Sequence, residues 1–439
     1  MNAVAGWKSK PLSQLLALIL DFRGKTPKKL GMQWGDGDIP ALSANNVEMG
    51  KIDLSKECYF GSDALYRKWM TKGDTRSGDI ILTTEAPLGN VAQIPDGRRY
   101  ILSQRTILLR ADENQLSNDY LRHYISSDEF QHLMRQQSSG TTATGIQRAK
   151  LEPLPIRFPV SMTEQAEIAR ILATVDSVIE NTDALLAKRR RIKTGVIEDL
   201  LTRGIDKAGN LRSEDTHEFK DSWLGRIPVE WDVKRIGEVF DIQLGKMLSQ
   251  KASVGKSPFA YLGNKNVQWD FVDSNDLQKM DFDERERSKY ALRVGDILVC
   301  EGGEVGRTCL WRGEVEPCYF QKAIHRLRPI DEQYLPRLFP HFMRWAVRRG
   351  ILADFVSQTS IAHLTQEKLS AVPIIVPPPE DQTRISISLD ATDSAGYYLQ
   401  AELKKLRRLK TGLIQDLLTG KKRVTALLEP SPHLAVEAV

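Results

Sequence analysis

The sequence predicts an α+β fold in which one structural unit occurs twice along the chain. Gly78–Leu82, with the sequence Gly-Asp-Ile-Ile-Leu, recurs 217 residues later as Gly295–Val299, with Gly-Asp-Ile-Leu-Val. Lys193–Thr202 recurs at the same distance as Lys410–Thr419, and both follow the pattern Lys-Thr-Gly-x-Ile-x-Asp-Leu-Leu-Thr. The units of solenoid repeats run about 20–50 residues. A period this long therefore indicates a whole domain followed by a long helix.

The composition supports two globular cores and gives no sign of a membrane or metal protein. Of the 439 residues, 41% are hydrophobic and 27% are charged, and the formal net charge is +5. That charge is too small to identify a nucleic-acid-binding protein by itself. The first apolar run, Leu15–Leu20, is too short to span a bilayer, and we find no secretory signal. The four cysteines form no Cys-x-x-Cys pair, so we expect a cytoplasmic protein without a zinc site.

Each globular part is expected to mix short strands with helices. The strands are apolar runs bounded by Gly, Asp or Ser, which is typical of buried strands. The predicted strands are Ile80–Leu82 and Ile107–Leu109 in the first copy, and Ile297–Val299 and Ile324–Leu327 in the second. The predicted helices are Tyr120–Met134 and Leu335–Phe355.

Two long helices are predicted to follow the globular parts. The first begins near Ser161, where a Ser-x-x-Glu pattern favours a helix N-terminus. Apolar residues then recur at steps of four and three, as a coiled-coil seam requires. The seam residues are Ile168, Leu172, Ile179, Leu186, Val196 and Leu200 in the first helix, and Ile385, Leu389, Leu403, Leu406, Leu413 and Leu417 in the second.

Either helix would be about 60 Å long at 1.5 Å per residue, and its apolar stripe needs a partner. The two stripes match in period, so we expect them to pair antiparallel as a coiled-coil spacer with internal pseudo-twofold symmetry. The alternatives are that each helix packs on its own domain or that the helices mediate dimerisation. The expected boundaries are 1–159 for the first domain, 160–204 for its helix, 205–230 for a polar linker, 231–377 for the second domain, 378–420 for its helix, and 421–439 for a tail.

Motifs of catalytic sites are missing from the sequence. Lys251–Ser257 resembles the end of a nucleotide-binding P-loop, but Gln250 stands where that motif needs its first glycine. Glu301–Gly306 is rich in glycine but does not follow Gly-x-Gly-x-x-Gly. We also find no Asn/Asp-Pro-Pro-aromatic motif, no zinc-binding histidine pair and no Gly-x-Ser-x-Gly elbow. We therefore expect a non-catalytic chain that binds no metal and no cofactor.

Polar and basic residues recur instead beside the ends of the predicted strands. Asn and Gln can pair with adenine, Arg and Lys with guanine, and Lys and Thr with phosphates. Ordinary turns and caps use the same residues, so that alternative stays open. The candidate DNA contacts are Lys25, Thr26, Asn45, Asn46, Gln104, Arg105, Thr141, Thr142, Lys246, Asn264, Lys265, Asn266, Gln321, Lys322, Thr359 and Ser360.

Basic runs lie within both predicted long helices, at Lys188–Arg191 and Lys404–Arg408. A solvated face of a coiled coil explains such runs. Contact with phosphates, or docking of an acidic partner, is the alternative.

Together these features resemble the specificity subunit of a type I restriction-modification system. The resemblance covers nearly the whole chain and is carried mainly by the repeated helix ends described above. Other carriers are Glu164-Gln165, Asp381-Gln382, Gly225–Trp231 and Gly24–Pro27. The second copy departs from the pattern at Gly245–Leu248, which puts that element in doubt.

The resemblance implies two target recognition domains, each reading one half of an asymmetric, split sequence of double-stranded DNA. The paired helices would fix the gap between the half-sites. Two methyltransferase subunits and, in a full complex, restriction subunits would be partners, and these would hold S-adenosylmethionine and ATP. Three other interpretations remain: a stand-alone two-domain DNA-binding regulator, the recognition part of a fused methyltransferase–nuclease, and a coiled-coil scaffold.

Overall fold

The computed structural model describes residues 4–139, 144–248, 258–356 and 362–425. The chain divides into two compact units, and each is described by itself. The first consists of Met1–Asp183 with Glu402–Val439, and the second of Ala184–Ala401. Both division points fall inside long helices, so each unit contains one half of each long helix.

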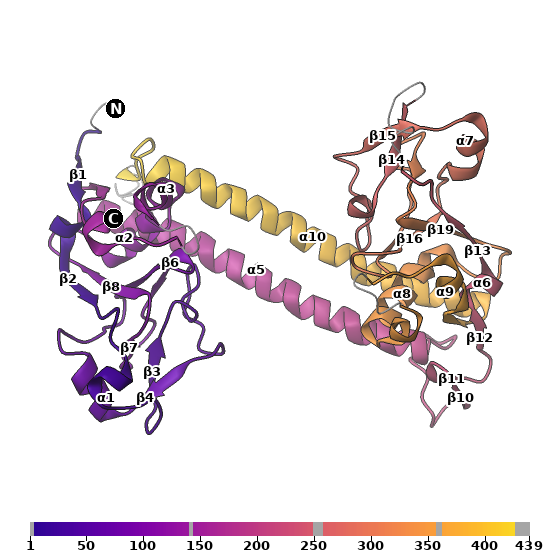
Figure 1. Cartoon of the computed structure of the whole chain (residues 1–439), viewed down its shortest axis with the longest axis horizontal. Helices are drawn as coiled ribbons and strands as arrows, with labels where there is room; N and C mark the ends of the chain where they lie inside the picture. The colour runs from indigo at the N-terminus through magenta and orange to yellow at the C-terminus, as the bar shows by residue number, and fades with distance from the viewer. Residues whose placement is uncertain (1–3, 140–143, 249–257, 357–361, 426–439) are drawn as a thin grey trace, which may run out of the picture. The chain divides into compact units, whose positions relative to one another are not determined.

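The first unit contains three small sheets (Figure 1). The largest is antiparallel, with the strand order β2 (Leu16–Asp21), β8 (Thr106–Ala111), β5 (Ile80–Thr84) and β6 (Leu88–Gln93). The second has the order β4 (Tyr59–Gly61), β3 (Ile39–Leu42) and β7 (Ile101–Leu102), with β3 and β7 parallel. The third pairs β1 (Trp7–Pro11) with β9 (Pro155–Pro159), which brings the two ends of the globular part together.

The second unit repeats this topology strand for strand. Its antiparallel sheet has the order β13 (Phe240–Leu244), β19 (Ile324–Pro329), β16 (Ile297–Cys300) and β17 (Thr308–Leu310). Its three-stranded sheet has the order β15 (Gln278–Asp281), β14 (Pro258–Leu262) and β18 (Tyr319–Phe320), again with one parallel pair. The pair β12 (Asp232–Arg235) and β20 (Pro373–Val376) completes the match. The predicted α+β repeat and its four strands are confirmed.

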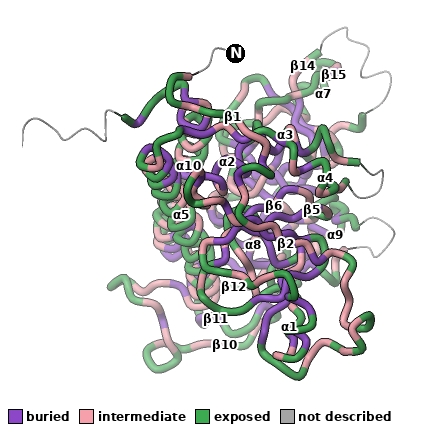
Figure 2. Tube along the Cα trace, turned by 90° about the vertical axis from the view of Figure 1, so that its left-hand side faces the viewer, coloured by how far each residue is buried: buried purple, intermediate pink, exposed green. Residues whose placement is uncertain are grey.

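The strands β5 and β16 show no alternation of buried and exposed positions, because both of their faces are buried. Ile80 and Leu82 pack in one core of the first unit, and Ile81 between them packs in another. Ile297 and Leu298 divide between two cores of the second unit in the same way. Successive side chains of a strand point to opposite faces, so a continuous apolar run covers both. Figure 2 shows β5 coloured as buried.

The repeated Gly-Asp of the sequence precedes β5 and β16. Asp79 is 1% exposed and accepts two hydrogen bonds from Arg110, at 2.7 and 2.6 Å. Asp296 is bound by Arg328 in the same two-pronged way. The repeat therefore holds neighbouring strands together by a buried ion pair.

The helix predicted at Tyr120–Met134 is two helices, α2 (Asn118–Ile125) and α3 (Asp128–Gln137). Ser127 breaks the run because its hydroxyl caps α3 by accepting the N–H of Phe130. Leu335–Phe355 is likewise divided into η5 (Pro336–Leu338), α8 (Phe339–Arg348) and η6 (Ile351–Phe355). The other short helices of the first unit are η1 (Leu12–Leu15), η2 (Pro27–Leu30), α1 (Asp63–Trp69) and α4 (Arg148–Leu151). Those of the second are α6 (Ile236–Val239), η4 (Asn264–Asn266), α7 (Glu284–Tyr290) and α9 (Gln366–Ala371).

The predicted polar linker at 205–230 is a folded segment. It contains the hairpin β10 (Phe219–Ser222) and β11 (Gly225–Pro228), and it buries Leu224 and Ile227 in the main core of the second unit. Burial of these two apolar side chains, which lie three residues apart around a turn, orders the segment despite its polar composition.

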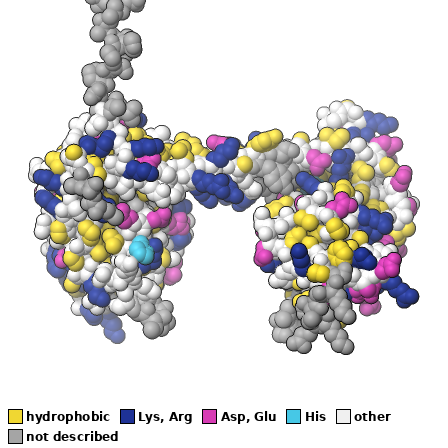
Figure 3. Space-filling view, turned by 90° about the horizontal axis from the view of Figure 1, so that it is seen from above, with side chains coloured by type: hydrophobic (Ala, Val, Ile, Leu, Met, Phe, Trp, Pro, Cys, Tyr) yellow, Lys and Arg dark blue, Asp and Glu magenta, His cyan; other side chains and the backbone are white. Residues whose placement is uncertain are grey.

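The long helices are α5 (Met162–Thr202), with 41 residues, and α10 (Pro379–Leu417), with 39. In the first unit their halves run antiparallel, because Asp176 pairs with Lys410 and Asp183, further along α5, pairs with Arg407. In the second unit Arg384 near the start of α10 donates to the carbonyl of Ile205, just beyond α5, at 3.2 Å. Basic side chains gather along the helical part of the chain (Figure 3).

The predicted seam residues are all buried or half-buried. Near the helix ends they also join the domain cores: Ile168, Leu172 and Leu417 belong to a core of the first unit. Leu200, Ile385 and Leu389 belong to the main core of the second. Helix pairing and packing of a helix on the domain that precedes it, which the sequence left as alternatives, therefore both occur. Leu200 and Leu417, at the C-terminal ends of the helices, pack instead in the core of the other copy.

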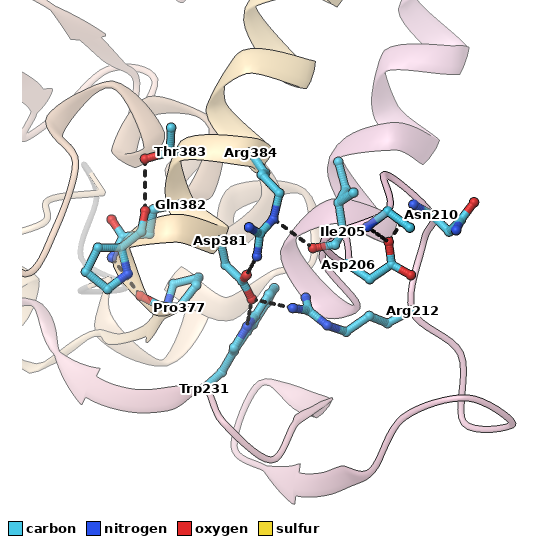
Figure 4. A network of polar contacts seen from close by, with 12 residues as sticks. Ile205, Asp206, Asn210, Arg212, Trp231, Pro377, Asp381, Gln382, Thr383 and Arg384 are labelled. Atoms are coloured by element: carbon cyan, nitrogen blue, oxygen red, sulfur yellow. Dashed lines mark hydrogen bonds and ion pairs between the residues drawn. The ribbon is translucent and has the colours of Figure 1, made fainter.

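The repeated Glu-Gln and Asp-Gln dipeptides fasten each long helix to its domain. Gln165 is fully buried, accepts the N–H of Ser117 and donates to two carbonyls, and Gln382 does the same with Leu335. The preceding acids are also buried: Glu164 pairs with Arg423, and Asp381 pairs with Arg212. Figure 4 shows Asp381 facing Arg212, Arg384 and Trp231.

Candidate nucleic-acid interface

Loops at the ends of both main sheets of the first unit surround a concavity with a volume of about 630 Å³. The loops follow β2, β3, β5 and β7. Five of the predicted contact residues line it together, although they come from three separate segments of the chain. These are Lys25, Thr26, Asn45, Gln104 and Arg105.

Three aromatic rings form one wall of this concavity. Trp34 stacks on Tyr59, with ring centres 5.7 Å apart and planes at 13°, and contacts Trp69 at 5.3 Å on a tilt of 39°. Trp69 is buried, whereas Tyr59 is 51% exposed at the outer end of the row. An exposed aromatic face beside polar groups is the kind of surface on which nucleic-acid bases and sugars pack.

Three cations line the concavity, and their partners differ. The Lys25 ammonium donates to the carbonyl of Trp69 at 2.6 Å, lies 4.8 Å from the Phe22 ring, and contacts no carboxylate within the described residues. Burial, with a smaller contribution from Lys72, lowers the pKa of Lys25. Lys56 pairs with Glu48 at 2.6 Å, and Arg105 lies 4.0 Å from Glu85. Lys25 is therefore the cation here whose charge is best placed to meet a phosphate.

Arg105 and Gln104 form the tight turn between β7 and β8. Arg105 has a positive φ of 64°, which is uncommon for a side chain with a Cβ, and its carbonyl accepts the N–H of Thr84. Both side chains are exposed. The turn therefore directs an amide and a guanidinium outward, where they can read base edges.

Asn46 and Asn266 brace loops and are too deeply buried to contact DNA. Asn46 has no exposed surface, accepts from the backbone and hydroxyl of Ser43, and donates to the carbonyls of Asp53 and Glu57. Asn266, 3% exposed, accepts the N–H of Gly263 and donates to the carbonyls of Asp273 and Asp276 in the second unit. The prediction of direct contact is wrong for these two residues, because their amides are already satisfied. Their neighbours Asn45 and Lys265 are exposed.

The second unit brings its predicted residues together in a similar way. A bridge joins Lys246 to Gln321, and the Gln321 N–H donates to Leu262, next to the loop of Asn264. The cations are paired with carboxylates, Lys246 with Glu286 at 2.6 Å and Lys265 with Asp276 at 2.5 Å. The carboxylate of Glu286 therefore balances the ammonium charge of Lys246, whose contact with DNA stays a prediction. Lys322 is exposed.

Four predicted residues, Thr141, Thr142, Thr359 and Ser360, lie outside the described residues.

Sequence reasoning missed Trp34, Lys56 and Tyr59. It relied on features present in both copies, and the aromatic pair is a feature of the first. Tyr59 lies opposite Ala41 in the three-stranded sheet, and the equivalent position opposite Tyr261 is Gln278. A comparison of differences between the copies would have found it.

The described part of the chain shows no cluster of three His, Cys, Asp or Glu side chains that could hold a metal ion. Burial raises the pKa of Cys300 to about 11 and that of Cys318 to about 12, which keeps both thiols protonated and unreactive at neutral pH. Within the same residues, no helix combines the length and apolar character needed to span a membrane.

Comparison with known proteins agrees with this architecture. The family described as the type I restriction modification DNA specificity domain matches residues 5–188 and 228–411. The chain is 25% identical to the type I restriction enzyme MjaVIII specificity subunit of Methanocaldococcus jannaschii, over 80% of each chain. It is 20% identical to the EcoKI specificity subunit of Escherichia coli, over 97% of this chain and 94% of that protein. The S subunit of a type I system from M. genitalium shares the fold, with a TM-score of 0.57 at 16% identity over 95% of this chain and 97% of that one.

The duplicated α+β units, with the polar concavity of the first, define a protein of two related recognition domains. The chain belongs to the family of type I restriction modification DNA specificity domains, and it carries two of them. Its general role is therefore DNA recognition within a type I restriction-modification system.

Proposed function

We propose that this chain is the non-catalytic subunit that reads an asymmetric DNA target divided into two half-sites. One observation carries the proposal: a single strand topology occurs twice, and the loops at equivalent places have different linings. In the first unit, Lys25 and the aromatic rings of Trp34, Tyr59 and Trp69 line the concavity. In the second unit, lysines paired with carboxylates lie at the equivalent places. Two domains with different contact chemistry would read two different base sequences.

The long helices would set the gap between the half-sites. Half-sites read from one face of B-DNA are separated by about one helical turn or a multiple of it. A continuous helix of 41 residues is about 60 Å long, and it holds its ends at a defined distance and rotation, which a flexible linker would not. The buried Gln165 and Gln382 clamps would transmit that geometry to the domains.

The partners would be two methyltransferase subunits and, in a full complex, restriction subunits. S-adenosylmethionine and ATP would bind to those partners and not to this chain. The duplication supports a pair of methyltransferases, because two equivalent helix-and-domain surfaces offer two equivalent docking sites. The specificity subunits to which the chain is similar are named as parts of type I restriction enzymes.

The test is to purify the chain with its candidate methyltransferase and to map methylated adenines in the host genome. A complex with two methyltransferase copies and a split, asymmetric motif is expected. Replacing residues 30–151 with the equivalent segment of a relative should then change one half-site and leave the other unchanged. If both halves of the motif change, the two domains do not read independently. If no complex forms and no split motif appears, a stand-alone DNA-binding regulator becomes the better interpretation.

A further inference from the structure

A second, smaller concavity of about 140 Å³ lies within the second unit. Its lining comes from α5, α8, α10 and the loop that follows η4. The basic lining residues are Arg189, Arg190, Lys193 and Arg344. Two of them belong to the basic run of α5, which neither the core nor the proposed function accounts for.

One carboxylate already sits among these cations. Asp270 pairs with Arg344 at 2.8 Å and with Lys193 at 3.6 Å. Arg189 and Arg190 are exposed, and neither forms an ion pair with any residue that the structure describes. Among the described residues, the pocket therefore contains the Asp270 carboxylate and two guanidinium groups that form no ion pair. A concave cluster of like charges raises the local concentration of anions.

Ring contacts hold this arrangement in place. Arg344 lies over the Trp269 ring at 4.9 Å, and the Trp269 indole N–H donates to Glu304 at 2.5 Å. These contacts hold the Trp269 ring in place, and the ring together with Arg344 forms one wall of the pocket. This wall of the pocket is preorganised, so an incoming anion would not need to order it.

Comparison of the two repeats shows that the carboxylate is special to the second copy. The loop is closed by the bridge Val267↔Val272, and the matching bridge in the first unit is Val47↔Ile52. Asp270 therefore occupies the position of Gly50. Both adopt a positive φ, 75° for the aspartate and 93° for the glycine. An L residue pays a conformational cost there, which the two ion pairs of Asp270 offset.

We propose that this pocket binds a phosphate of the DNA backbone through Arg189 and Arg190, next to the half-site read by the second domain. The inference rests on the proposed function. The pocket is too small for a base and its sugar, whereas the planar guanidinium fork matches phosphate oxygens. The loop that supplies Asp270 also carries Asn264 and Lys265, so DNA held by those residues would bring its backbone toward the same loop.

A charge-matched pair of variants tests the proposal in the complex with the methyltransferase subunits. One is Arg189→Ala with Arg190→Ala. The control is Lys188→Ala with Arg191→Ala, which removes the same charge from the same helix at exposed positions that do not line the pocket. Alanine favours helix, so both should fold, and circular dichroism checks this. Affinity for a duplex with the mapped target is measured between 50 and 200 mM salt.

The pocket variant should flatten the plot of log affinity against log salt by about 1 unit of slope, more than the control does. It should weaken specific and non-specific duplexes alike, and the methylated motif should stay the same. Duplexes with single neutral methylphosphonates then locate the contact: one position near the second half-site should weaken the wild type and not the pocket variant.

Three results would overturn the proposal. Equal effects of the two variants would mean that only the general field of the helix matters, and no effect of either would mean that DNA does not reach the pocket. Loss of methyltransferase from the pocket variant, with an unchanged salt slope, would show instead that the arginines dock a protein. None of these results touches the split motif of the wild type, whose absence would refute the proposed function itself.

Discussion

Removing the Asp381 carboxylate should destabilise the second unit more than any surface change of equal charge. Asp381 is 3% exposed and begins α10, where it accepts the indole N–H of Trp231 at 2.8 Å and pairs with Arg212 at 2.8 Å. Arg212 and Trp231 are themselves 7% and 0% exposed. Asp381→Ala would leave a buried indole N–H without an acceptor and would remove the carboxylate partner of the buried Arg212 guanidinium (Figure 4).

Breaking a buried ion pair by removing one partner costs about 3–5 kcal/mol, and an unsatisfied buried donor costs about 1–3 kcal/mol. These costs overlap, and Arg212 keeps the hydrogen bond that it already donates to the carbonyl of Arg203 at 3.4 Å. We therefore expect a loss of about 3–5 kcal/mol in the free energy of unfolding. Asp381→Asn keeps an oxygen for the indole and should lose less.

Urea denaturation followed by circular dichroism gives the free energy, and amide hydrogen exchange shows whether the loss is confined to the second unit. The control is Asp276→Ala, which removes an exposed partner of Lys265 and should cost less than about 1 kcal/mol. If Asp381→Ala falls within 1 kcal/mol of this control, the buried network does not hold the helix start, and our account of the repeated dipeptides is wrong.

Three further outcomes are expected. Gln165→Ala and Gln382→Ala each remove three hydrogen bonds of a buried amide, so each should lower the free energy of unfolding by about 2–4 kcal/mol. Each should also lower hydrogen-exchange protection mainly in its own unit. An equal loss of protection in both units would contradict the local role of these glutamines. Burial, with smaller effects of Arg122 and Lys410, lowers the pKa of His123 to about 3, although Asp176 lies 3.8 Å away. As the pH falls, the imidazole therefore binds a proton in the unfolded chain before it does so in the folded chain. The free energy of unfolding should fall by up to about 1.4 kcal/mol per pH unit below about pH 6.5. His123→Gln should flatten that slope, and the control His132→Gln, at an exposed position, should not. Deleting one heptad from both α5 and α10 shortens each helix by about 10 Å, which is the length of about three base pairs of DNA. The gap in the methylated motif should then shorten, or methylation should cease. An unchanged gap would contradict the spacer role.

Patterns that depend on neighbours in the sequence were predicted well. The seam of α5 and α10 follows from spacing alone, and all twelve predicted seam residues are buried or half-buried. Ile80–Leu82 and Ile297–Val299 are strands because short apolar runs without helical period have few other uses. The break between α2 and α3 was missed because Ser127 is tolerated inside a helix as well as at its start.

The contact residues show where sequence reasoning stops. Asn45 and Asn46 are adjacent and chemically identical, yet one is exposed and the other is buried with every amide bond used. The charge of Lys246 is cancelled by Glu286, which lies 40 residues further along the chain. Trp34 and Tyr59 meet across a loop and a strand. None of these outcomes has a signal in the local sequence, because each is decided by a partner that folding brings near.

The sequence by itself determined the duplication, the α+β class, the two long helices and, through the resemblance carried by the repeated motifs, the type of protein. Local periodicity and repeated residues are enough for these. Only the tertiary structure decided that each compact unit combines one domain with halves of both helices, so that the first unit joins residues from both ends of the chain. It also decided which polar side chains face solvent and which brace loops. The physical reason is that burial and charge pairing are long-range properties: an apolar stripe or a buried acid specifies that it needs a partner, and the folded chain selects which one.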